Sequence, residues 1–539
     1  MAGARNSVDR GLLLVVLLSL AVGVAAQWAG FFNEYVVNDD VRQQLFWMQR
    51  WVDPGLYPDT LLTSYSEAYV PWGVQGVYRL ASLVISPLMF SKVLAVALLA
   101  LLTGCVFAMV RRDADEVAGW MGVAVCLATP LFLYNISGGL ARAFAAPLMA
   151  LFLLFWQRCN FPALSLVLFA QAVFIPYIFA VCALAAGLGF VGSLVSLAPE
   201  NKRLLTSLSC ALPILAGVAM VLIWRHEMAA SGFGPLVGMD ALHGPEFAAS
   251  GRFPLFPPLS VFGELIAPFG FIFPFRDGGV VAGVVAAVCV VLLALLGWVK
   301  SPRALSLPGL SMPLACLGLA SLILYVAARL TMLKLFIPSR YLSYSWELVL
   351  TIGLAVLLGS ACRRFLSRGP WLALFVAAVV CLGAVRLHGV SLYDYSGTRG
   401  ISEAVRRTPK DALLFGHPST LDNVMTFGRR NAYATYELAH PWNSGYWDKY
   451  RERLYDTFRQ YYSDDPASLG KFLREKGITH VVVDREDFSE RGLAEPRFFE
   501  PFDSFVLELV RGRKAFALPA GNGLDAVWHD ERYALLKVR

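Results

Sequence analysis

The sequence predicts an α-helical polytopic membrane protein of about 11 transmembrane helices, followed by a C-terminal extracytoplasmic α/β domain. Of 539 residues, 57% are hydrophobic and only 16% are charged, and the mean hydropathy is +0.57. Soluble domains are about 45–50% apolar and about 25% charged. The charges are also uneven, because residues 390–539 hold 22 acidic and 22 basic side chains, about half of the total. This composition excludes a soluble enzyme, a disordered chain and a fibrous repeat.

The transmembrane helices are predicted from apolar runs approaching 20 residues. The run that follows Arg5 and Arg10 begins like a signal peptide, but Ala25-Ala26-Gln27 leads into aromatic residues, which favours an uncleaved helix. Pro176 either breaks one span or separates two. Counted as two, they bring the predicted spans to eleven: Gly11–Phe32, Phe90–Val110, Ala118–Tyr134, Ala143–Trp156, Phe161–Phe174, Tyr177–Leu197, Leu208–Trp224, Val280–Val299, Met312–Leu330, Tyr344–Ala361 and Trp371–Leu387.

Basic residues set the predicted orientation. The first 389 residues hold 24 basic and 17 acidic side chains, so they carry the whole net charge of +7. Every second loop is basic, as the positive-inside rule requires for cytoplasmic loops: Arg111-Arg112, Arg158, Lys202-Arg203, Lys300 with Arg303, and Arg363-Arg364 with Arg368. We therefore expect an integral protein of a bacterial inner or plasma membrane with a cytoplasmic N-terminus, and no nucleic-acid partner.

Two domains follow from this pattern: a membrane domain, 1–389, with long outer loops 33–86 and 225–279, and a soluble domain, 390–539. The soluble domain is predicted to be α/β. Its helix begins after Asp465, an N-cap with Pro466 at the first helical position, and ends at Gly477. Strands are predicted from β-branched and aromatic residues: Ala412–Gly416, Thr479–Asp484, Phe505–Val510, Lys514–Leu518 and Ala534–Val538.

An acidic motif, Asn38-Asp39-Asp40, directly follows the first span. Adjacent carboxylates at a membrane surface need water, a charge partner or a cation. Asp39 or Asp40 could act as a general base, or bind Mg²⁺ or Mn²⁺ that neutralises a phosphate leaving group. The alternative is that the pair caps a helix N-terminus. Arg42, close behind, is a candidate phosphate ligand.

Other polar residues in outer segments extend the candidate site. In the first outer loop, Asp59, Tyr65 and Glu67 could contact a sugar or an acceptor, although a turn between interfacial helices is favoured. Arg142 ends a glycine-containing outer connection and could bind phosphate bidentately or pair with a carboxylate. Lys334 and Arg340, the latter followed by Tyr341, are positive charges in an outer connection and so oppose the positive-inside pattern. This favours binding of an anionic lipid phosphate over a structural ion pair.

Taken in order, these features resemble the GT-C superfamily of polytopic membrane glycosyltransferases. The resemblance rests on Asp39-Asp40 after the first helix, the long first outer loop, Arg340-Tyr341 before a late helix and the outer C-terminal domain. The layout is most similar to bacterial aminoarabinose and mannosyl transferases. The soluble domain lacks the Trp-Trp-Asp motif of oligosaccharyltransferases, which puts transfer to asparagine sequons in doubt.

The resemblance implies a sugar donor carried on polyprenyl phosphate or diphosphate and an envelope glycan, lipid or protein acceptor. It implies that Asp39 or Asp40 is the catalytic base or metal ligand, that Arg340 holds the donor phosphate and that Tyr341 positions it. Arg142 and Lys334 are added from charge and topology. The alternative is a non-catalytic subunit, flippase or transporter of an envelope polysaccharide system. The near absence of charge within the spans disfavours ion-coupled transport.

Overall fold

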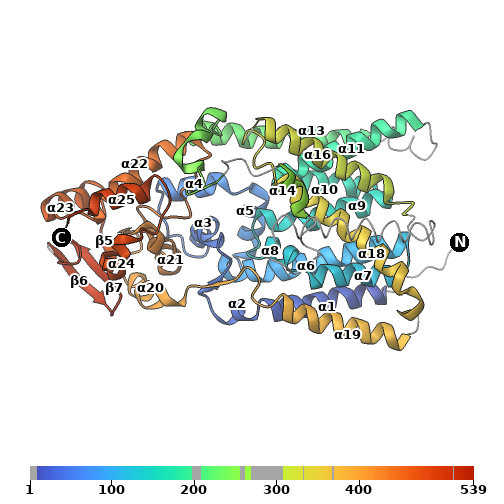
Figure 1. Cartoon of the computed structure of the whole chain (residues 1–539), viewed down its shortest axis with the longest axis horizontal. Helices are drawn as coiled ribbons and strands as arrows, with labels where there is room; N and C mark the ends of the chain where they lie inside the picture. The colour runs from blue at the N-terminus through green and yellow to red at the C-terminus, as the bar shows by residue number, and fades with distance from the viewer. Residues whose placement is uncertain are drawn as a thin grey trace.

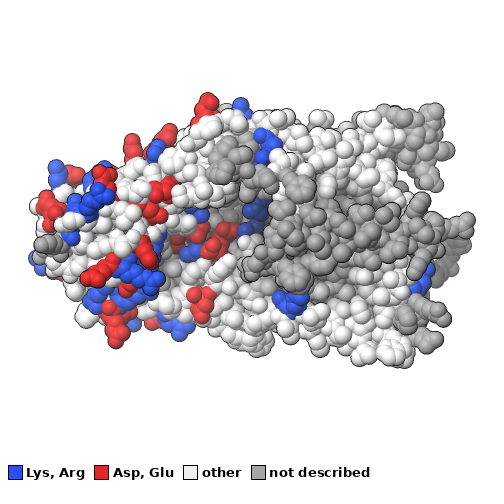
Figure 2. All heavy atoms as spheres, viewed as in Figure 1, with Lys and Arg blue, Asp and Glu red and all other residues white. Residues whose placement is uncertain are grey.

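The computed structural model describes residues 9–196, 208–254, 261–268, 307–331, 333–366, 369–513, 515–521 and 523–539. The molecule is elongated, with long helices at one end and a small sheet at the other (Figure 1). The first described residues lie at the helical end and the C-terminus lies at the sheet end. Charged side chains gather around the sheet, whereas the described surface of the long helices is mostly uncharged (Figure 2).

Apolar helices form the larger part of the fold, as the sequence predicts for a membrane protein. Within the described residues, five helices are long and apolar enough to cross a membrane: α6 (Pro87–Asp113), α13 (Leu208–Ala230, from Pro213), α16 (Ser311–Thr331), the stretch Arg340–Arg363 and α19 (Gly369–Arg386). Helices α7 (Glu116–Ala128) and α8 (Pro130–Ile136) form a pair bent by 64°. Shorter apolar helical stretches lie in α1 (Arg10–Ala26), α9 (Ala145–Gln157), α10 (Phe161–Phe174) and Pro176–Gly192 of α11 (Pro176–Ser196). The predicted span Val280–Val299 lies outside the described residues, so the count of eleven stays a prediction.

Helix packing explains two uncertain points of the sequence. Helix α1 packs against α6 and α19, and Ser19 and Thr103 form a buried hydroxyl–hydroxyl hydrogen bond of 2.7 Å between α1 and α6. The first apolar run is therefore part of the helical core. Pro176 separates two helices, since α10 ends at Phe174 and α11 begins at Pro176.

The segment 33–86 is a folded layer between the long helices and the C-terminal part. It contains β1 (Val36–Val37), α3 (Val41–Gln44), the 3₁₀ helix η1 (Phe46–Trp51), α4 (Leu61–Tyr69) and α5 (Trp72–Ala81). Large aromatic side chains fill it, because Trp47, Tyr57, Tyr65 and Tyr78 are all fully buried. A stretch that the sequence presents as an outer loop thus contributes to the hydrophobic core that continues into the helices and the C-terminal part.

The C-terminal part is α/β, with a five-stranded sheet in the order β4-β3-β5-β7-β6. Strands β3 (Leu413–Phe415), β4 (Asn431–Ala432) and β5 (His480–Asp484) pair in parallel, and β7 (Tyr533–Val538) and β6 (Leu524–His529) are antiparallel additions. The remaining helices are α20 (Arg399–Arg406), α21 (Pro418–Gly428), α22 (Ser444–Tyr461), α23 (Pro466–Glu475), α24 (Glu490–Ala494) and α25 (Phe502–Val510).

Several predicted elements of this part are confirmed and two are wrong. Helix α23 has Asp465 as its N-cap, accepting from the Ala467 amide at 2.9 Å, and Gly477 follows its end with φ +66°. The predicted strand Phe505–Val510 is instead the end of α25, because Phe502 and Val506, four residues apart, both face the core. The described residues 515–518 of the other predicted strand form no strand.

The two parts of the chain are joined by direct pairing. Strand β1 pairs antiparallel with β2 (Tyr393–Asp394), with Val37 opposite Tyr393. The Tyr57 hydroxyl donates to the Met425 carbonyl at 2.8 Å, and the Asn431 amide donates to the Pro58 carbonyl at 2.7 Å. These contacts place the start of α3 against the C-terminal part.

Candidate functional site

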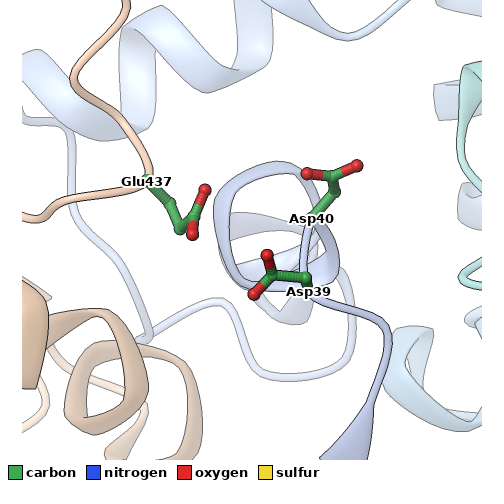
Figure 3. A group of neighbouring side chains, drawn as sticks. All are labelled: Asp39, Asp40 and Glu437. Atoms are coloured by element: carbon green, nitrogen blue, oxygen red, sulfur yellow. The ribbon is translucent and has the colours of Figure 1, made fainter. Parts of the chain in front are cut away.

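Three carboxylates meet where the segment after α1 contacts the C-terminal part. Asp39 and Asp40 stand at the start of α3, and Glu437 comes from the chain after β4 (Figure 3). One carboxylate oxygen of each lies within 4.8 Å of the others. The acidic motif predicted from sequence is thus joined by a third acid almost 400 positions later in the chain.

Asn38 fixes the backbone that carries the two aspartates. Its Nδ2 donates to the Ser391 hydroxyl at 2.7 Å and to the Ser391 carbonyl at 3.1 Å. Its Oδ1 accepts from the Asp40 amide at 3.2 Å. The Asp40 side chain makes no capping hydrogen bond to α3. Helix capping, the structural alternative for this motif, is therefore not what the Asp40 carboxylate does.

Asp39 has the most exposed carboxylate of the three, with 43% of its side chain accessible. Its Oδ1 accepts a hydrogen bond from the Tyr395 hydroxyl at 2.7 Å and pairs with the Arg42 guanidinium. Arg42 is itself buried; it also donates to Glu437 Oε1 at 3.1 Å and to Asn423 at 3.0 Å, and lies 4.3 Å from the centre of the Tyr395 ring. Asp39 is thus oriented on one side and open on the other.

Asp40 has a protein partner on each oxygen. Its Oδ2 pairs with Arg142 Nη1 at 2.7 Å, and its Oδ1 accepts from Gln43 Nε2 at 2.9 Å. Arg142 also donates to Asn38 Oδ1 at 3.3 Å. Gly138, with φ +87°, lets this connection approach, because a Cβ there would lie 2.8 Å from the Asn38 Cβ. The glycines before Arg142 therefore set its distance from the acidic motif.

Glu437 is buried between two arginines and a second acid. Arg42 and Arg252 each donate to one of its oxygens, at 3.1 and 3.0 Å. Its backbone amide donates to the Asp422 carboxylate at 3.0 Å. Burial raises the pKa of Glu437 above its ordinary value, and the neighbouring Asp422 carboxylate raises this pKa further.

The donor set suits a hard divalent cation. Mg²⁺ and Mn²⁺ prefer oxygen ligands, and Mg²⁺ typically takes one or two protein carboxylates together with water and substrate phosphate. Asp39 and Asp40, the two acids with exposed surface, could supply such carboxylates. Each of the three acids already has an arginine partner, so a cation would compete with guanidinium groups.

Lys334, Arg340 and Tyr341, which the sequence predicts to bind a lipid phosphate, lie before and at the start of α17 (Arg340–Ser343). Helix α17 leads into α18 (Ser345–Leu366). Arg340 Nη1 donates to the Tyr344 hydroxyl at 2.6 Å. Tyr341 is buried and its hydroxyl donates to the Leu335 carbonyl, whereas Lys334 is exposed. Among the described residues, no carboxylate lies within ion-pairing distance of Arg340 or Lys334.

Tyr69 on α4 lies within electrostatic range of both the basic group and the acidic one. Burial raises the pKa of the Tyr69 hydroxyl to about 12; the Asp40 charge adds to the increase, while Arg340 and Arg142 oppose it. Asp40, Arg142 and Arg340 therefore act on one hydroxyl from different elements. The structure brings Asp39, Asp40, Arg42, Arg142 and Arg340 into one region.

The structure separates two of the first-loop candidates, Asp59 and Glu67, from this region. Asp59 and Glu67 are exposed and share Arg50, at 3.3 and 3.4 Å. They line a cleft of about 770 Å³ beside Trp72 and Trp224. Tyr65 is fully buried, and its ring stacks on that of Tyr446 with 3.5 Å between the ring centres.

Sequence reasoning missed several residues of the cluster: Tyr395, Glu437, Arg252 and Tyr344. Tyr395 and Glu437 come from the C-terminal part and reach Asp39 only through the β1–β2 pairing and the contacts of the segment 33–86. No local spacing links them to the acidic motif. Tyr344 carried a weak signal, since it lies four residues after Arg340 on the same helical stretch.

No family model matches the chain, and no curated protein matches its sequence. Solved structures do resemble it. An archaeal oligosaccharyltransferase, AglB from Archaeoglobus fulgidus in complex with an inhibitory peptide and a dolichol-phosphate, aligns with 92% of this chain and 71% of its own at 13% identity and a TM-score of 0.53. ArnT from Cupriavidus metallidurans aligns over 98% of both chains, at 15% identity and a TM-score of 0.46 in the apo state. With undecaprenyl phosphate bound, ArnT aligns over the same shares, at 16% identity and a TM-score of 0.42. The chain therefore shares the fold of the AglB structure.

Proposed function

We propose that the protein is a glycosyltransferase that moves a sugar from a polyprenyl-phosphate or polyprenyl-diphosphate donor to an envelope glycan, lipid or protein acceptor on the outer face of the membrane. The observation that carries the proposal is the position of Asp39. Its carboxylate is partly exposed, held by Tyr395 and Arg42, and next to a group of arginines at the ends of apolar helices.

Asp39 is suited to the role of general base. An acceptor hydroxyl would attack the anomeric carbon of the donor sugar on the side opposite the phosphate. The new carbon–oxygen bond forms as the bond to the phosphate oxygen breaks. The hydroxyl proton passes to the Asp39 carboxylate, and the polyprenyl phosphate leaves with the bonding electron pair. The Tyr395 hydrogen bond and the Arg42 pair fix the carboxylate for this transfer.

Arg142 and Arg340 are the proposed ligands of the donor phosphate. Guanidinium groups bind phosphate oxygens bidentately and stay charged when partly buried. Tyr344 orients Arg340 through its 2.6 Å hydrogen bond, and Asp40 orients Arg142. Lys334, which is exposed on the same connection, would attract the anionic headgroup. The apolar helices beside these residues offer a place for the lipid chain.

Arg42 has a different role in this proposal from the one the sequence suggests. It is only 7% exposed, and its guanidinium is already bonded to Asp39, Glu437 and Asn423. A group with so little free surface is better placed to orient Asp39 than to bind a phosphate. Tyr341 likewise has its hydroxyl committed to the Leu335 carbonyl, so Tyr344 takes the positioning role beside Arg340.

A divalent cation would be held by Asp39 and Asp40, with Glu437 close enough to contribute. Bound there, Mg²⁺ or Mn²⁺ would supply positive charge to the leaving phosphate. In that case the Arg142 guanidinium would be released from Asp40 toward the substrate, whereas Arg42 would keep its bonds to Glu437 and Asn423. Transfer measured with chelator, and then with each metal added back, decides between the two arrangements.

The proposed orientation places the N-terminus in the cytoplasm and residues 390–539 outside. Arg111 pairs with Asp9 beside the N-terminus, and Arg363 pairs with Asp115. Helix α3, which begins directly after Asp40, lies beyond the opposite end of the long helices, between them and the C-terminal part (Figure 1). This arrangement supports a membrane domain of 1–389 that carries the chemistry and an outer domain that closes over it.

Complementation of a host strain lacking the gene tests the proposal. Envelope glycans, lipids and proteins are extracted from strains carrying the wild-type chain or Asp39→Asn, and are compared by mass spectrometry. We expect a sugar-sized mass increment that depends on the wild-type chain and disappears with Asp39→Asn. An increment restored equally by both chains would contradict catalysis at Asp39 and favour a non-catalytic role in an envelope polysaccharide system.

A further inference from the structure

A buried chain of hydrogen bonds runs from Asp40 into the C-terminal part. Gln43 Nε2 donates to Asp40 Oδ1 at 2.9 Å, and Gln43 Oε1 lies 2.7 Å from His440 Nε2. His440 Nδ1 lies 3.0 Å from the Tyr65 hydroxyl, which accepts from the Asn443 amide at 2.8 Å. Gln43, His440, Tyr65 and Asn443 are each no more than 8% exposed.

The chemistry of the partners fixes the direction of each bond. Asp40 can only accept, so Gln43 presents its amide nitrogen to Asp40 and its amide oxygen to His440. His440 therefore carries its proton on Nε2 and accepts at Nδ1 from the Tyr65 hydroxyl. Burial lowers the pKa of His440 well below its ordinary value, with Arg252 adding to the effect, so the ring is neutral. Reversing one bond would leave a buried group unpaired.

The His440 ring is also held by packing. It stacks on Trp442 with 4.3 Å between ring centres, and the Tyr69 ring lies 5.0 Å away. Tyr65 in turn stacks on Tyr446. The hydrogen-bonded chain thus ends in rigid aromatic contacts, which can fix a side chain at the other end.

We propose that Gln43, His440 and Tyr65 are positioning residues that hold Asp40 so that Asp40 orients Arg142 toward the donor phosphate. The inference rests on the proposed function, and it separates the two adjacent aspartates. Asp40, with a protein partner on each oxygen, is a positioning group, and Asp39 remains the reacting carboxylate. It also gives the C-terminal part a direct role in the geometry of the site.

The variants His440→Phe, Gln43→Leu and Tyr65→Phe test the chain. Phe at 440 keeps the ring that packs on Trp442 and removes both polar atoms. We expect a loss of about 10- to 100-fold in kcat/KM, mainly through KM for the donor, as one mispositioned group commonly costs. His417→Phe is the matched control, because His417 is equally buried in the C-terminal part but lies against Phe458 and Phe498; it should leave transfer unchanged.

A double-mutant cycle distinguishes positioning from general stabilisation. If His440 acts through Asp40, His440→Phe added to Asp40→Asn should lower kcat/KM no further. Multiplicative losses, or wild-type kinetics of His440→Phe, would overturn the proposal. If His440→Phe does not fold, the same cycle with Tyr65→Phe decides. The affinity of each variant for undecaprenyl phosphate, measured by native mass spectrometry, is the second readout.

This second readout keeps the two proposals distinguishable. Wild-type transfer with a multiplicative cycle contradicts only the positioning proposal. Absence of wild-type transfer contradicts the proposed function. In that case the affinity for undecaprenyl phosphate still tests the positioning of Arg142. The positioning proposal is supported if His440→Phe and Asp40→Asn each lower this affinity and the double variant lowers it no further. Affinity unchanged by both would refute it.

Discussion

Replacing Asp39 with Asn isolates chemistry from folding at this site. The substitution keeps the size of the side chain and an oxygen that can accept from the Tyr395 hydroxyl, but removes the charge and the proton acceptor. A general base contributes about 10²- to 10⁴-fold to a rate. We therefore expect kcat for sugar transfer to fall by about this factor, while KM for the donor changes by less than about threefold.

The folding cost of the same change should be small. An ion pair on a side chain that is 43% exposed contributes about 0–1 kcal/mol. The buried Arg42 guanidinium keeps its bonds to Glu437 and Asn423, so no buried charge is left without a partner. The free energy of unfolding should change by about 1 kcal/mol or less.

The assay compares wild-type and Asp39→Asn chains, matched by their elution from size-exclusion chromatography and by their midpoints of thermal unfolding. Transfer is followed with polyprenyl-phosphate-linked sugars extracted from host membranes. Asp40→Asn serves as the companion variant, and its loss should appear mainly in KM for the donor. A rate of Asp39→Asn within a factor of about three of wild type, with normal folding, would refute the assignment of Asp39 as the base.

Three further predictions follow from single contacts. Arg340→Ala should weaken undecaprenyl phosphate binding about 10-fold or more, since a charge-assisted hydrogen bond contributes about 1.5–3 kcal/mol; unchanged affinity in native mass spectrometry would remove Arg340 from the donor site. Burial raises the pKa of the Glu437 carboxyl in the folded protein. The stabilising contribution of this carboxyl is therefore fully present below the ordinary carboxyl pKa and is lost as pH rises through the raised value. The midpoint of thermal unfolding should fall as pH rises above about 5 in the wild type, and should fall less steeply in Glu437→Gln. Gly138→Ala should lower the free energy of unfolding by about 1–3 kcal/mol and reduce transfer, because the new Cβ would lie 2.8 Å from Asn38. The control Gly187→Ala should change neither, because a Cβ at position 187 meets no atom within 4 Å. Equal stability of the two variants would contradict the packing described around Asn38.

The helical part of the fold could be predicted because its signal is local. Apolar runs of membrane length do not need distant partners to be recognised, and Asp465, Pro466 and Gly477 mark the ends of a helix by their own backbone chemistry. The prediction of a strand at Phe505–Val510 was wrong because it relied on residues that favour strands. Packing of Phe502 and Val506 against the core overrides that preference and gives a helix.

The candidate site was only half visible in the sequence. Asp39, Asp40 and Arg340 stood out because charge at the edge of an apolar span is unusual. Tyr395 and Glu437 lie in a polar domain where such residues are common, and only tertiary contacts bring them to Asp39. The sequence places Tyr65 in a predicted outer loop, whereas the folded segment 33–86 buries its side chain completely.

The most direct test is transfer by the purified chain itself. Wild-type and Asp39→Asn proteins in lipid nanodiscs receive a membrane extract of the host that supplies polyprenyl-linked sugars and acceptors, and mass spectrometry follows both products. The account predicts free polyprenyl phosphate and a sugar-sized mass gain on one acceptor with the wild-type chain, and neither with Asp39→Asn. Equal yields of both products from the two proteins, or none from the wild type, would contradict it.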